Sequence, residues 1–230
     1  MDITISQRTL ATSPTARRQS ATVPATMLDP AARALVFDID GTLADTMPLH
    51  FIAWMDASRR HGFPFDETVF FAMAGMPARQ ILETIARDHH LAIDPVAVTA
   101  DKEAGFMRLI PRVQPIHPVV QVVKDCFGKL PMALGTGATR EVAWTTIDAV
   151  GLRPYFDILV SSQDVARHKP EPDTFLECAR RMRADPKDCQ VFEDADLGLE
   201  AARRAGMIPF DVRPWINGAK GRHGRRLPPT

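Results

Sequence analysis

Two aspartates separated by one residue, Asp38 and Asp40, follow an apolar run of the 230-residue sequence and precede Gly41 and Thr42. Side chains at i and i+2 of an extended segment point to the same side, so both carboxylates can face one reacting atom. A carboxylate can attack phosphorus and form an acyl phosphate, which divides a slow transfer into two easier steps. Asp40 is free to protonate the leaving alcohol and then to deprotonate the incoming water. This spacing predicts phosphoryl transfer.

Three later motifs offer groups that suit a phosphate site: Gly135-Thr136-Gly137, Lys169-Pro170 and Glu193-Asp194. The Thr136 hydroxyl can donate a hydrogen bond to a phosphoryl oxygen, and Gly137 lets its N–H group approach closely. Lys169 places a positive charge on the same group. Attack of one anion on another needs a cation, and the oxygen set of Asp38, a backbone carbonyl and Asp194 favours Mg²⁺.

Each motif also has a plain structural interpretation. Asp, Gly and Thr all favour turns, so the Asp38 motif could be a turn alone. Thr136 could lie in an ordinary loop, Lys169 could be solvated, and Glu193-Asp194 could cap a helix. Four such motifs in this order, each following a strand-like run, favour the phosphate site.

Strand-like apolar runs precede the motifs, and helical segments separate these runs. We predict strands at residues 34–37, 132–134, 157–160, 190–192 and 208–212, and helices at 140–150, 174–182 and 199–205. Strands that alternate with helices indicate βαβ units around a parallel sheet. Ligands of such sheets bind beyond the carboxyl ends of the strands, so the four motifs are expected at one edge.

A helical insertion follows the first strand. Residues 48–116 show helical periodicity without a clear strand, and prolines at positions 64, 77, 95 and 111 divide the segment into several helices. We therefore predict an α/β core of residues 31–47 and 117–213, interrupted by a helical domain at 48–116. Residues 1–30 are expected to form a disordered leader and residues 214–230 a tail, because both are rich in polar, basic or small residues.

The composition excludes several function classes. Lys and Arg number 28 and Asp and Glu also number 28, so no net basic charge favours nucleic acid as a partner. The longest apolar run, Val69–Ala74, is too short to cross a membrane. Three widely spaced cysteines predict free thiols in a reducing compartment, the cytoplasm. We expect a monomer or weak dimer whose partner is a small molecule.

The motifs together resemble those of a known superfamily. The run Phe37–Leu43 is similar to the first motif of the haloacid dehalogenase (HAD) superfamily, and Thr136, Lys169 and Glu193-Asp194 match the next three in order. The resemblance covers residues 34–212 and extends to the β-phosphoglucomutase-like group, whose α-helical cap the insertion resembles. Residues 191–198 and 201–207 look most like bacterial fructose-1-phosphate phosphatases. The resemblance implies an α/β fold, with a Rossmann-like parallel sheet core and an inserted α-helical cap domain.

The resemblance also implies roles for individual residues. Asp38 would be the phosphorylated nucleophile and Asp40 the general acid and base, while Thr136 and Lys169 would bind the transferring phosphoryl group. Mg²⁺ would take Asp38, the carbonyl of Asp40 and Asp194.

The fourth motif departs from the common pattern. Many superfamily members carry another aspartate four residues beyond the metal aspartate, where this chain has Gly198. Glu193 is therefore expected either to bind the metal as the additional ligand or to lie next to the residues that bind it. Asp196 is at no matching site, and we expect it to cap the following helix.

The predicted cap contributes further candidates. Thr46, His50 and Trp54 recur every four residues and lie on one face of the first cap helix. The resembled group has a histidine near the substrate at the position of His50, and Lys102 matches a cap lysine of the mutases. The alternative for His50 is a packed or solvated helix histidine, and the alternative for Trp54 is a core position. A solvated charged face is the alternative for Lys102.

These observations predict a Mg²⁺-dependent phosphatase that hydrolyses small sugar phosphates, fructose 1-phosphate first among them, through a phosphoaspartate. The alternatives are a β-phosphoglucomutase-type phosphomutase and a non-catalytic phosphate-binding regulatory protein. A dehalogenase would lack the second aspartate, Asp40. A mutase needs a second phosphate site in the cap, and in the mutases that this chain resembles that site is an arginine after a Gly-x-Ser turn. Here the run Gly75–Arg79 has no serine, and Arg79 is displaced by one residue, so we expect it to point away from the crevice.

Overall fold

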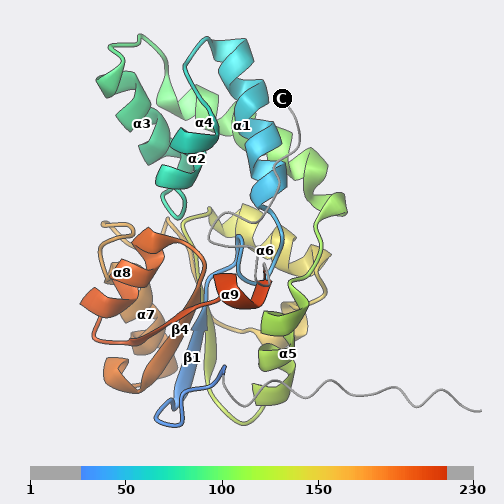
Figure 1. The fold of residues 1–230 in the computed structure, drawn as a ribbon, viewed down its shortest axis with the longest axis vertical. Helices are drawn as coiled ribbons and strands as arrows, with labels where there is room; N and C mark the ends of the chain where they lie inside the picture. The colour runs from blue at the N-terminus through green and yellow to red at the C-terminus, as the bar shows by residue number, and fades with distance from the viewer. Residues whose placement is uncertain (1–26, 217–230) are drawn as a thin grey trace, which may run out of the picture.

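A five-stranded parallel sheet forms the centre of the protein. The computed structural model describes residues 27–216. The strands are β1 (Ala34–Phe37), β2 (Met132–Gly135), β3 (Leu159–Val160), β4 (Cys189–Glu193) and β5 (Ile208–Asp211). Their order is β3-β2-β1-β4-β5, and every neighbouring pair is parallel (Figure 1). All five predicted strands are present, and the third is shorter than predicted.

Helices cover both faces of this sheet. Leu35 and Phe37 of β1 pack in one apolar cluster with α5 (His117–Cys126) and α6 (Arg140–Ala149). Ala34 and Val36 pack in a second cluster with α7 (Asp173–Met182) and α8 (Asp196–Arg204). The alternation follows from the period of two in a strand. Helix α5 could not be predicted from the sequence, because β-branched valines dominate it and give a weak helical signal.

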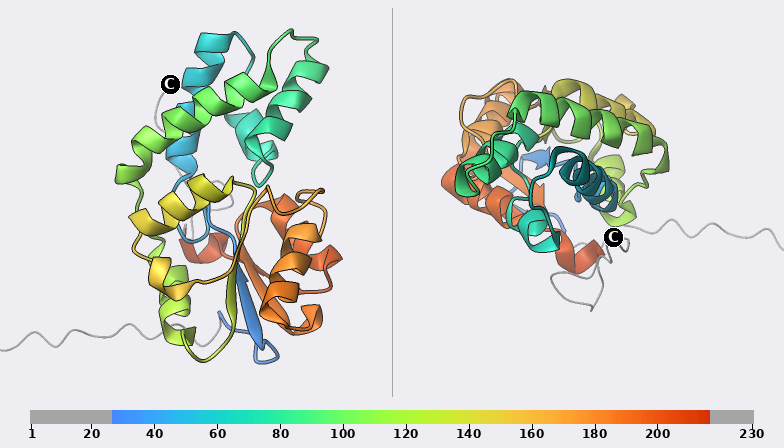
Figure 2. Two further views of the ribbon diagram at one scale, coloured as in Figure 1. Left: turned by 180° about the vertical axis from the view of Figure 1, so that it is seen from behind. Right: turned by 90° about the horizontal axis from the view of Figure 1, so that it is seen from above.

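The insertion folds into helices above the carboxyl ends of the strands (Figures 1 and 2). It contains α1 (Met47–His61), α2 (Glu67–Ala72), α3 (Ala78–Asp88) and α4 (Pro95–Leu109). Pro77 precedes α3 and Pro95 begins α4, as expected for residues that lack an N–H donor. An apolar cluster of its own, with Phe51, Trp54 and Phe70 at its centre, stabilises the cap. The predicted α/β core with an inserted helical cap is confirmed.

The packed chain begins earlier than predicted. Met27 is fully buried in the main apolar cluster. Its carbonyl accepts a hydrogen bond of 2.8 Å from Nε2 of Gln190, and the N–H of Asp29 donates to Oε1 of Gln190 at 2.9 Å. The predicted leader of residues 1–30 is therefore wrong over residues 27–30, which pack on β4. Residues 1–26 lie outside the described part of the chain.

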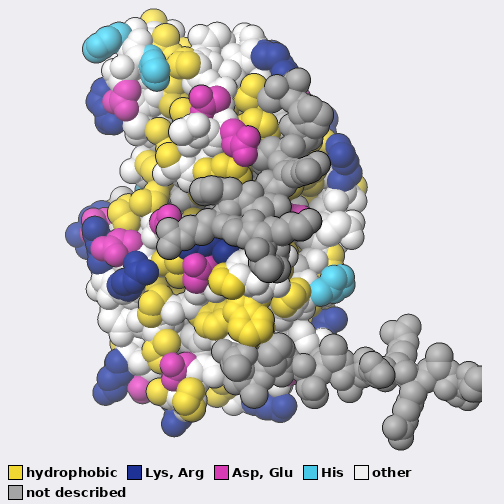
Figure 3. All heavy atoms as spheres, viewed as in Figure 1, with side chains coloured by type: hydrophobic (Ala, Val, Ile, Leu, Met, Phe, Trp, Pro, Cys, Tyr) yellow, Lys and Arg dark blue, Asp and Glu magenta, His cyan; other side chains and the backbone are white. Residues whose placement is uncertain are grey.

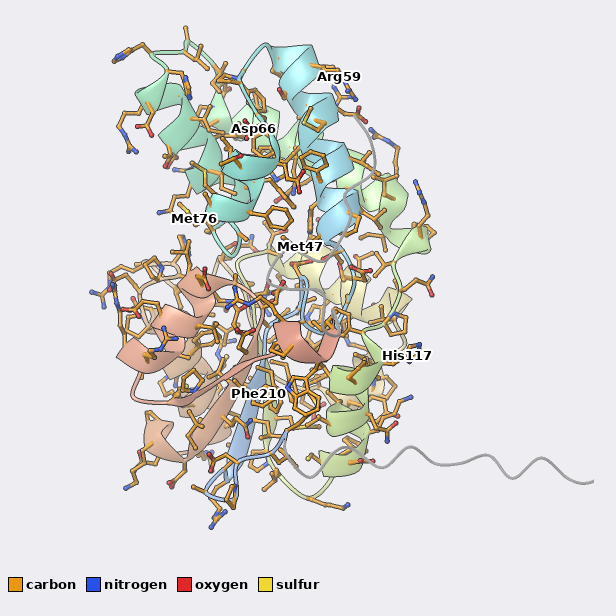
Figure 4. The ribbon with its side chains drawn as sticks, viewed as in Figure 1. Met47, Arg59, Asp66, Met76, His117 and Phe210 are labelled. Carbon is orange, nitrogen blue, oxygen red and sulfur yellow. The ribbon has the colours of Figure 1, made fainter. Side chains whose placement is uncertain are left out.

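The end of the described chain also packs on the core. The short helix α9 (Arg213–Ile216) follows β5, and the ring of Trp215 lies 6.2 Å from the ring of Phe210, which Figure 4 labels. Trp215 packs against the main apolar cluster. Residues 214–216 of the predicted tail thus belong to the folded domain, and residues 217–230 lie outside the described part.

Three further features bear on the chemical environment of the protein. Cys126, Cys178 and Cys189 are buried free thiols, as the sequence predicts. Within residues 27–216, no helix combines the length and the hydropathy that a membrane span requires. On the surface drawn in Figure 3, acidic and basic side chains are interspersed, in agreement with their equal numbers.

Candidate active site

A buried ion-pair cluster lies where β1 and β4 end. Nζ of Lys169 donates hydrogen bonds of 2.7 Å to Oδ1 of Asp38 and to Oε1 of Glu193, and all three side chains are almost completely buried. Burial alone would lower the pKa of Lys169, but the two carboxylates raise it overall, so the lysine stays charged. Lys169 therefore brings a fixed positive charge to the predicted nucleophile.

Asp38 lies in a strongly acidic environment. Burial raises the pKa of Asp38 well above its ordinary value, and the charges of Glu193, Asp194 and Asp40 raise it further, against the effect of Lys169. Oxygen atoms of Asp38, Glu193 and Asp194 lie within 4.8 Å of one another. This all-oxygen set fits a hard divalent cation such as Mg²⁺, and such a cation would favour the ionised carboxylates.

Small residues leave room for the Asp194 carboxylate. Gly41 has a φ of +89°, and a Cβ at this position would overlap Oδ2 of Asp194. The Thr42 hydroxyl donates a hydrogen bond of 3.3 Å to Oδ1 of the same side chain. The glycine and threonine that follow the two aspartates in the sequence thus position Asp194, 152 residues later in the chain.

Both oxygens of Glu193 already have partners. Oε1 accepts from Lys169, and Oε2 accepts from the backbone N–H groups of Asp194 and Ala195 at 2.6 and 2.8 Å. A Cβ at Gly198 would overlap Oε1 of Glu193. A longer side chain at position 198 is therefore incompatible with this placement of Glu193, which explains why the chain combines a glutamate at 193 with a glycine at 198.

The predicted cap by Asp196 is wrong. Ala195 occupies the N-cap position of α8, without a side-chain hydrogen bond, and Asp196 is the first residue of the helix. The Asp196 carboxylate instead pairs with Nη1 of Arg213 at 2.8 Å. The Glu193 carboxylate, in contrast, accepts hydrogen bonds from the N–H groups of Asp194 and Ala195, the two residues that precede α8.

Asp40 bonds to two residues near the start of the cap. The Thr46 hydroxyl donates to Oδ1 of Asp40 at 2.8 Å, and Nε2 of His50 lies 3.1 Å from the same atom. Nζ of Lys102 lies 3.0 Å from Nδ1 of His50 and 5.2 Å from the ring centre of Trp54. Because an ammonium can only donate, Nδ1 accepts and Nε2 carries the proton that His50 donates to Asp40. The chain Lys102–His50–Asp40 links the cap to the core.

The ionisation of this chain follows from its burial. Burial alone would raise the pKa of Asp40, but His50, Thr46 and Lys102 hold it below its ordinary value, so Asp40 is a carboxylate. Burial and the charge of Lys102 lower the pKa of His50, which is neutral. Burial lowers the pKa of Lys102 to about 8, so most of this lysine is charged at pH 7.

Thr136 and Gly137 border the same site from the end of β2. Thr136 is buried, and its Oγ1 accepts a 3.0 Å hydrogen bond from the N–H of Ala138, which leaves the hydroxyl hydrogen to donate elsewhere. A Cβ at Gly137 would lie only 2.7 Å from the carbonyl oxygen of Gly75 in the cap. Gly137 therefore permits the cap loop to approach the core, a role that its sequence context did not reveal.

These groups surround a cavity of about 90 Å³ between cap and core, which we call the inner cavity. Its core side carries the polar side chains of Asp38, Asp40, Thr136, Glu193 and Asp194. The cap adds three polar side chains, His50 from α1 and Lys102 and Glu103 from α4. Its cap side is largely apolar, and Met47 and Met76 are labelled at the lower edge of the cap in Figure 4. Most of these apolar lining residues could not be recognised from the sequence, because their pattern is that of ordinary core positions: Met47, Phe70, Met73, Met76 and Ile81.

The comparisons with known proteins agree with this fold. Residues 32–206 match the haloacid dehalogenase-like hydrolase family. The chain is 44% identical over 180 residues to the fructose-1-phosphate phosphatase YqaB of Escherichia coli. The aligned residues make up 78% of this chain and 95% of that protein. It is 26% identical over 187 residues to the β-phosphoglucomutase of Bacillus subtilis, covering 78% of this chain and 83% of that protein.

A solved structure shows the same fold. The β-phosphoglucomutase of Clostridium difficile superposes with a TM-score of 0.70 at 22% identity, over 78% of this chain and 84% of that one. The protein described here belongs to the haloacid dehalogenase-like hydrolases. The predicted superfamily is confirmed, and the chain is an enzyme of the hydrolase class.

Proposed function

We propose that this enzyme is a Mg²⁺-dependent phosphatase that hydrolyses small sugar phosphates through a phosphoaspartate at Asp38. The observation that carries the proposal is that buried Lys169 pairs with Asp38, which lines the inner cavity together with the carboxylates of Glu193 and Asp194. This arrangement concentrates a nucleophile, a fixed positive charge and oxygen ligands at one point. The family and the phosphatase relative support the same chemistry.

The first half of the proposed reaction transfers the phosphoryl group to the enzyme. A carboxylate oxygen of Asp38 bonds to phosphorus, and the bond between phosphorus and the sugar oxygen breaks. Lys169, the Thr136 hydroxyl and the Gly137 N–H hold the phosphoryl oxygens. Asp40 gives its proton to the departing sugar oxygen. Asp40 has to gain that proton first, and a bound phosphate ester favours this because a nearby anion raises the pKa of a carboxyl group.

The metal would be held by Asp38, the carbonyl oxygen of Asp40 and Asp194. When bound, Mg²⁺ offsets the repulsion between the nucleophile and the phosphate and polarises the phosphoryl oxygens. Glu193 supports this site by holding Lys169 and the N–H groups of the following residues, which agrees with the occupation of both its oxygens.

The second half regenerates the enzyme. Asp40, now a carboxylate, accepts a proton from a water molecule whose oxygen bonds to phosphorus. The bond between phosphorus and Asp38 breaks, and inorganic phosphate leaves with the Asp38 carboxylate restored. His50 and Thr46 orient Asp40 through their hydrogen bonds, and the cap excludes bulk water from the crevice.

The position of Arg79 favours the phosphatase over the mutase alternative. Arg79 is exposed, pairs with Glu83 one turn further along α3 at 2.7 Å, and does not line the inner cavity. No arginine within residues 27–216 lines the inner cavity, so a second phosphate bound there would lack a bidentate guanidinium partner. Water is then the acceptor of the phosphoryl group. The intact set of Asp38, Asp40 and Lys169 favours turnover over the third alternative, a regulatory phosphate-binding protein.

The substrate class follows from the relatives and from the site. The phosphatase relative acts, by its name, on fructose 1-phosphate, and the inner cavity has room for a small ester. We propose a sugar phosphate of this size as the substrate, without a nucleic-acid or membrane partner, for a monomer or weak dimer in the cytoplasm.

A panel of phosphorylated metabolites with and without Mg²⁺ tests this proposal, with released phosphate as the readout. We expect fructose 1-phosphate among the best substrates and no activity after chelation of divalent cations. Asp38→Asn should fold and show negligible turnover, because an amide cannot form the acyl phosphate. Asp88→Asn, an exposed residue of α3, is the matched control. Normal turnover in Asp38→Asn would refute the proposal.

An assay with β-glucose 1-phosphate and a trace of the bisphosphate distinguishes a phosphatase from a phosphomutase. Free phosphate is expected as the main product. Stoichiometric glucose 6-phosphate with little free phosphate would show that the enzyme is a mutase.

A further inference from the structure

Arg213, the first residue of α9, binds the end of β5 through its side chain. Nε donates a hydrogen bond of 2.8 Å to Oδ1 of Asp211, and Nη2 donates one of 2.7 Å to Oδ2 of the same carboxylate. Only 16% of the Arg213 side chain is exposed. Two parallel hydrogen bonds fix the plane of a guanidinium, so its remaining nitrogen, Nη1, is also held at a defined place.

Nη1 of Arg213 contacts the loop that carries Asp194. It lies 2.8 Å from Oδ1 of Asp196, the first residue of α8. On the other side of Asp194, the carbonyl oxygen of Glu193 accepts a hydrogen bond of 2.9 Å from the N–H of Val212, which is fully buried. Two consecutive residues after β5, Val212 and Arg213, thus hold the chain on both sides of Asp194.

The position of Asp194 matters for the metal site. Its carboxylate belongs to the oxygen cluster within 4.8 Å that fits a divalent cation. Groups that do not touch a metal contribute to its affinity when they hold the ligands in place before the metal binds. Arg213 and Asp196 do not line the inner cavity, so contact with the substrate does not explain their pairing.

We propose that Arg213 is a positioning residue for the metal site: by holding Asp196, it keeps the Asp194 carboxylate where a divalent cation can bind. The inference rests on the proposed Mg²⁺-dependent phosphatase and adds a residue that touches neither substrate nor metal. The charge of Arg213 alone has the opposite effect, because a guanidinium repels a cation. Removal of this charge would strengthen Mg²⁺ binding, whereas loss of the positioning contact weakens it.

Mg²⁺ binding to the Arg213→Met variant tests the inference without any substrate. Mn²⁺ that Mg²⁺ displaces from the enzyme is measured by its electron paramagnetic resonance signal, which gives the dissociation constant for Mg²⁺. We expect this constant to rise about fivefold, less than the ~10-fold or more that follows loss of a direct partner of a metal ligand. Phosphate release should need a correspondingly higher Mg²⁺ concentration, while kcat at saturating Mg²⁺ and KM for the sugar phosphate stay near their wild-type values.

Two further variants test the same contact. The Asp196 side chain is 80% exposed, so Asp196→Asn leaves the packed core intact. Its dissociation constant for Mg²⁺ should rise about threefold, because the contact with Arg213 is weakened. Arg213→Lys keeps the positive charge but not the planar fork, and its constant should lie between those of Arg213→Met and the wild type.

A second ion pair on α8 supplies matched controls. Arg203 and Glu200 pair at 3.4 Å further along this helix. Arg203→Met and Glu200→Gln remove the same charges as Arg213→Met and Asp196→Asn, and their dissociation constants for Mg²⁺ should equal that of the wild type. Melting temperatures show which variants fold.

Unchanged or tighter Mg²⁺ binding in folded Arg213→Met would overturn the inference. Wild-type binding in Asp196→Asn would overturn it as well, and this variant alone decides if Arg213→Met does not fold. If the wild type bound Mg²⁺ but hydrolysed no sugar phosphate, the proposed activity would be wrong, while the binding comparison would still decide the role of Arg213. If the wild type bound neither Mn²⁺ nor Mg²⁺, the metal site and this inference would be wrong together.

Discussion

Nζ of Lys169 lies 2.7 Å from Oδ1 of Asp38, although 131 residues separate the two in the chain. Both side chains are buried, so neither can exchange its partner for water without a cost in free energy. The parallel sheet creates this contact, because β1 carries Asp38 at its end and the segment after β3 carries Lys169. The pair fixes the position of the proposed nucleophile before any substrate binds, which is the preorganisation that the proposed phosphoryl transfer would require.

Gly198→Ala should disturb the active site from outside it. The new Cβ would overlap Oε1 of Glu193, which cannot move freely because Lys169 and two N–H groups hold the carboxylate. We expect kcat to fall at least tenfold and stability to fall by about 1–3 kcal/mol. Urea unfolding and phosphate release measure both effects. Arg203→Ala, an exposed residue of the same helix, should change neither. If kcat of the Gly198→Ala variant equalled that of the wild type, the position of the Glu193 carboxylate would not matter for turnover.

The Lys102→Met variant should be more stable and less active than the wild type. The pKa of buried Lys102 is lowered to about 8, below its value in the unfolded chain, so folding at pH 7 carries a cost for keeping this amine charged. That cost is present at pH values below about 8 and disappears as the pH rises past the unfolded pKa near 10.5. We expect Lys102→Met to be more stable by about 2–3 kcal/mol at pH 7, with a smaller advantage at pH 10.

Denaturant titrations at the two pH values measure this difference, and sugar-phosphate hydrolysis should be impaired in the same variant because His50 loses its partner. A variant that is less stable than the wild type at pH 7 would contradict the assigned cost of burial.

Asp164→Asn should destabilise the segment that leads to Lys169. Burial opposes ionisation of Asp164, yet hydrogen bonds from Arg181 and Ser161 hold its pKa at about 2. A lowered folded pKa stabilises the protein above the unfolded pKa of about 4, and this contribution is lost as the pH falls toward 2. We expect the free energy of unfolding of this variant to be lower than that of the wild type by about 2 kcal/mol at pH 7 and by roughly half as much at pH 3. An equal difference at both pH values would contradict this explanation.

Met27→Ala tests whether the chain before β1 belongs to the core. The side chain is fully buried, so its truncation should cost about 2–3 kcal/mol of unfolding free energy, measured in urea. Deletion of residues 2–28 should therefore lower the melting temperature, whereas an apolar-to-apolar exchange, Met27→Leu, should nearly preserve it. A melting temperature that is unchanged in Met27→Ala would show that residue 27 contributes nothing to the core.

The sequence predicted the strands well, because buried parallel strands are short apolar runs and the polar motifs mark their ends. Asp38, Thr136 and Asp194 could be placed at one edge by this rule alone. The contact between Lys102 and His50 could not be predicted, since it depends on how α4 packs against α1 over a separation of 52 residues.

Other features could not be read from the sequence for similar reasons. Met27 and its neighbour Leu28 pack on the main apolar cluster as an isolated pair, without the periodic pattern that marks an element. The conflict between a side chain at 198 and the Glu193 carboxylate depends on atomic distances across a turn. The role of Gly137 likewise depends on the approach of Gly75 from the cap, which no local pattern of residues indicates.

The central claim, a phosphoaspartate at Asp38, is tested most directly by the Asp40→Asn variant with 4-nitrophenyl phosphate. This ester needs no proton on its leaving group, so phosphorylation should proceed while the water step, which needs Asp40 as a base, is slowed at least a hundredfold. Rapid mixing should show a burst of one nitrophenolate per enzyme, and peptide mass spectrometry of the acid-quenched protein should locate a phosphoryl group on Asp38. The double variant with Asp38→Asn should give neither signal. Steady release without a burst, or a burst that persists in the double variant, would contradict the assignment of Asp38 as the nucleophile.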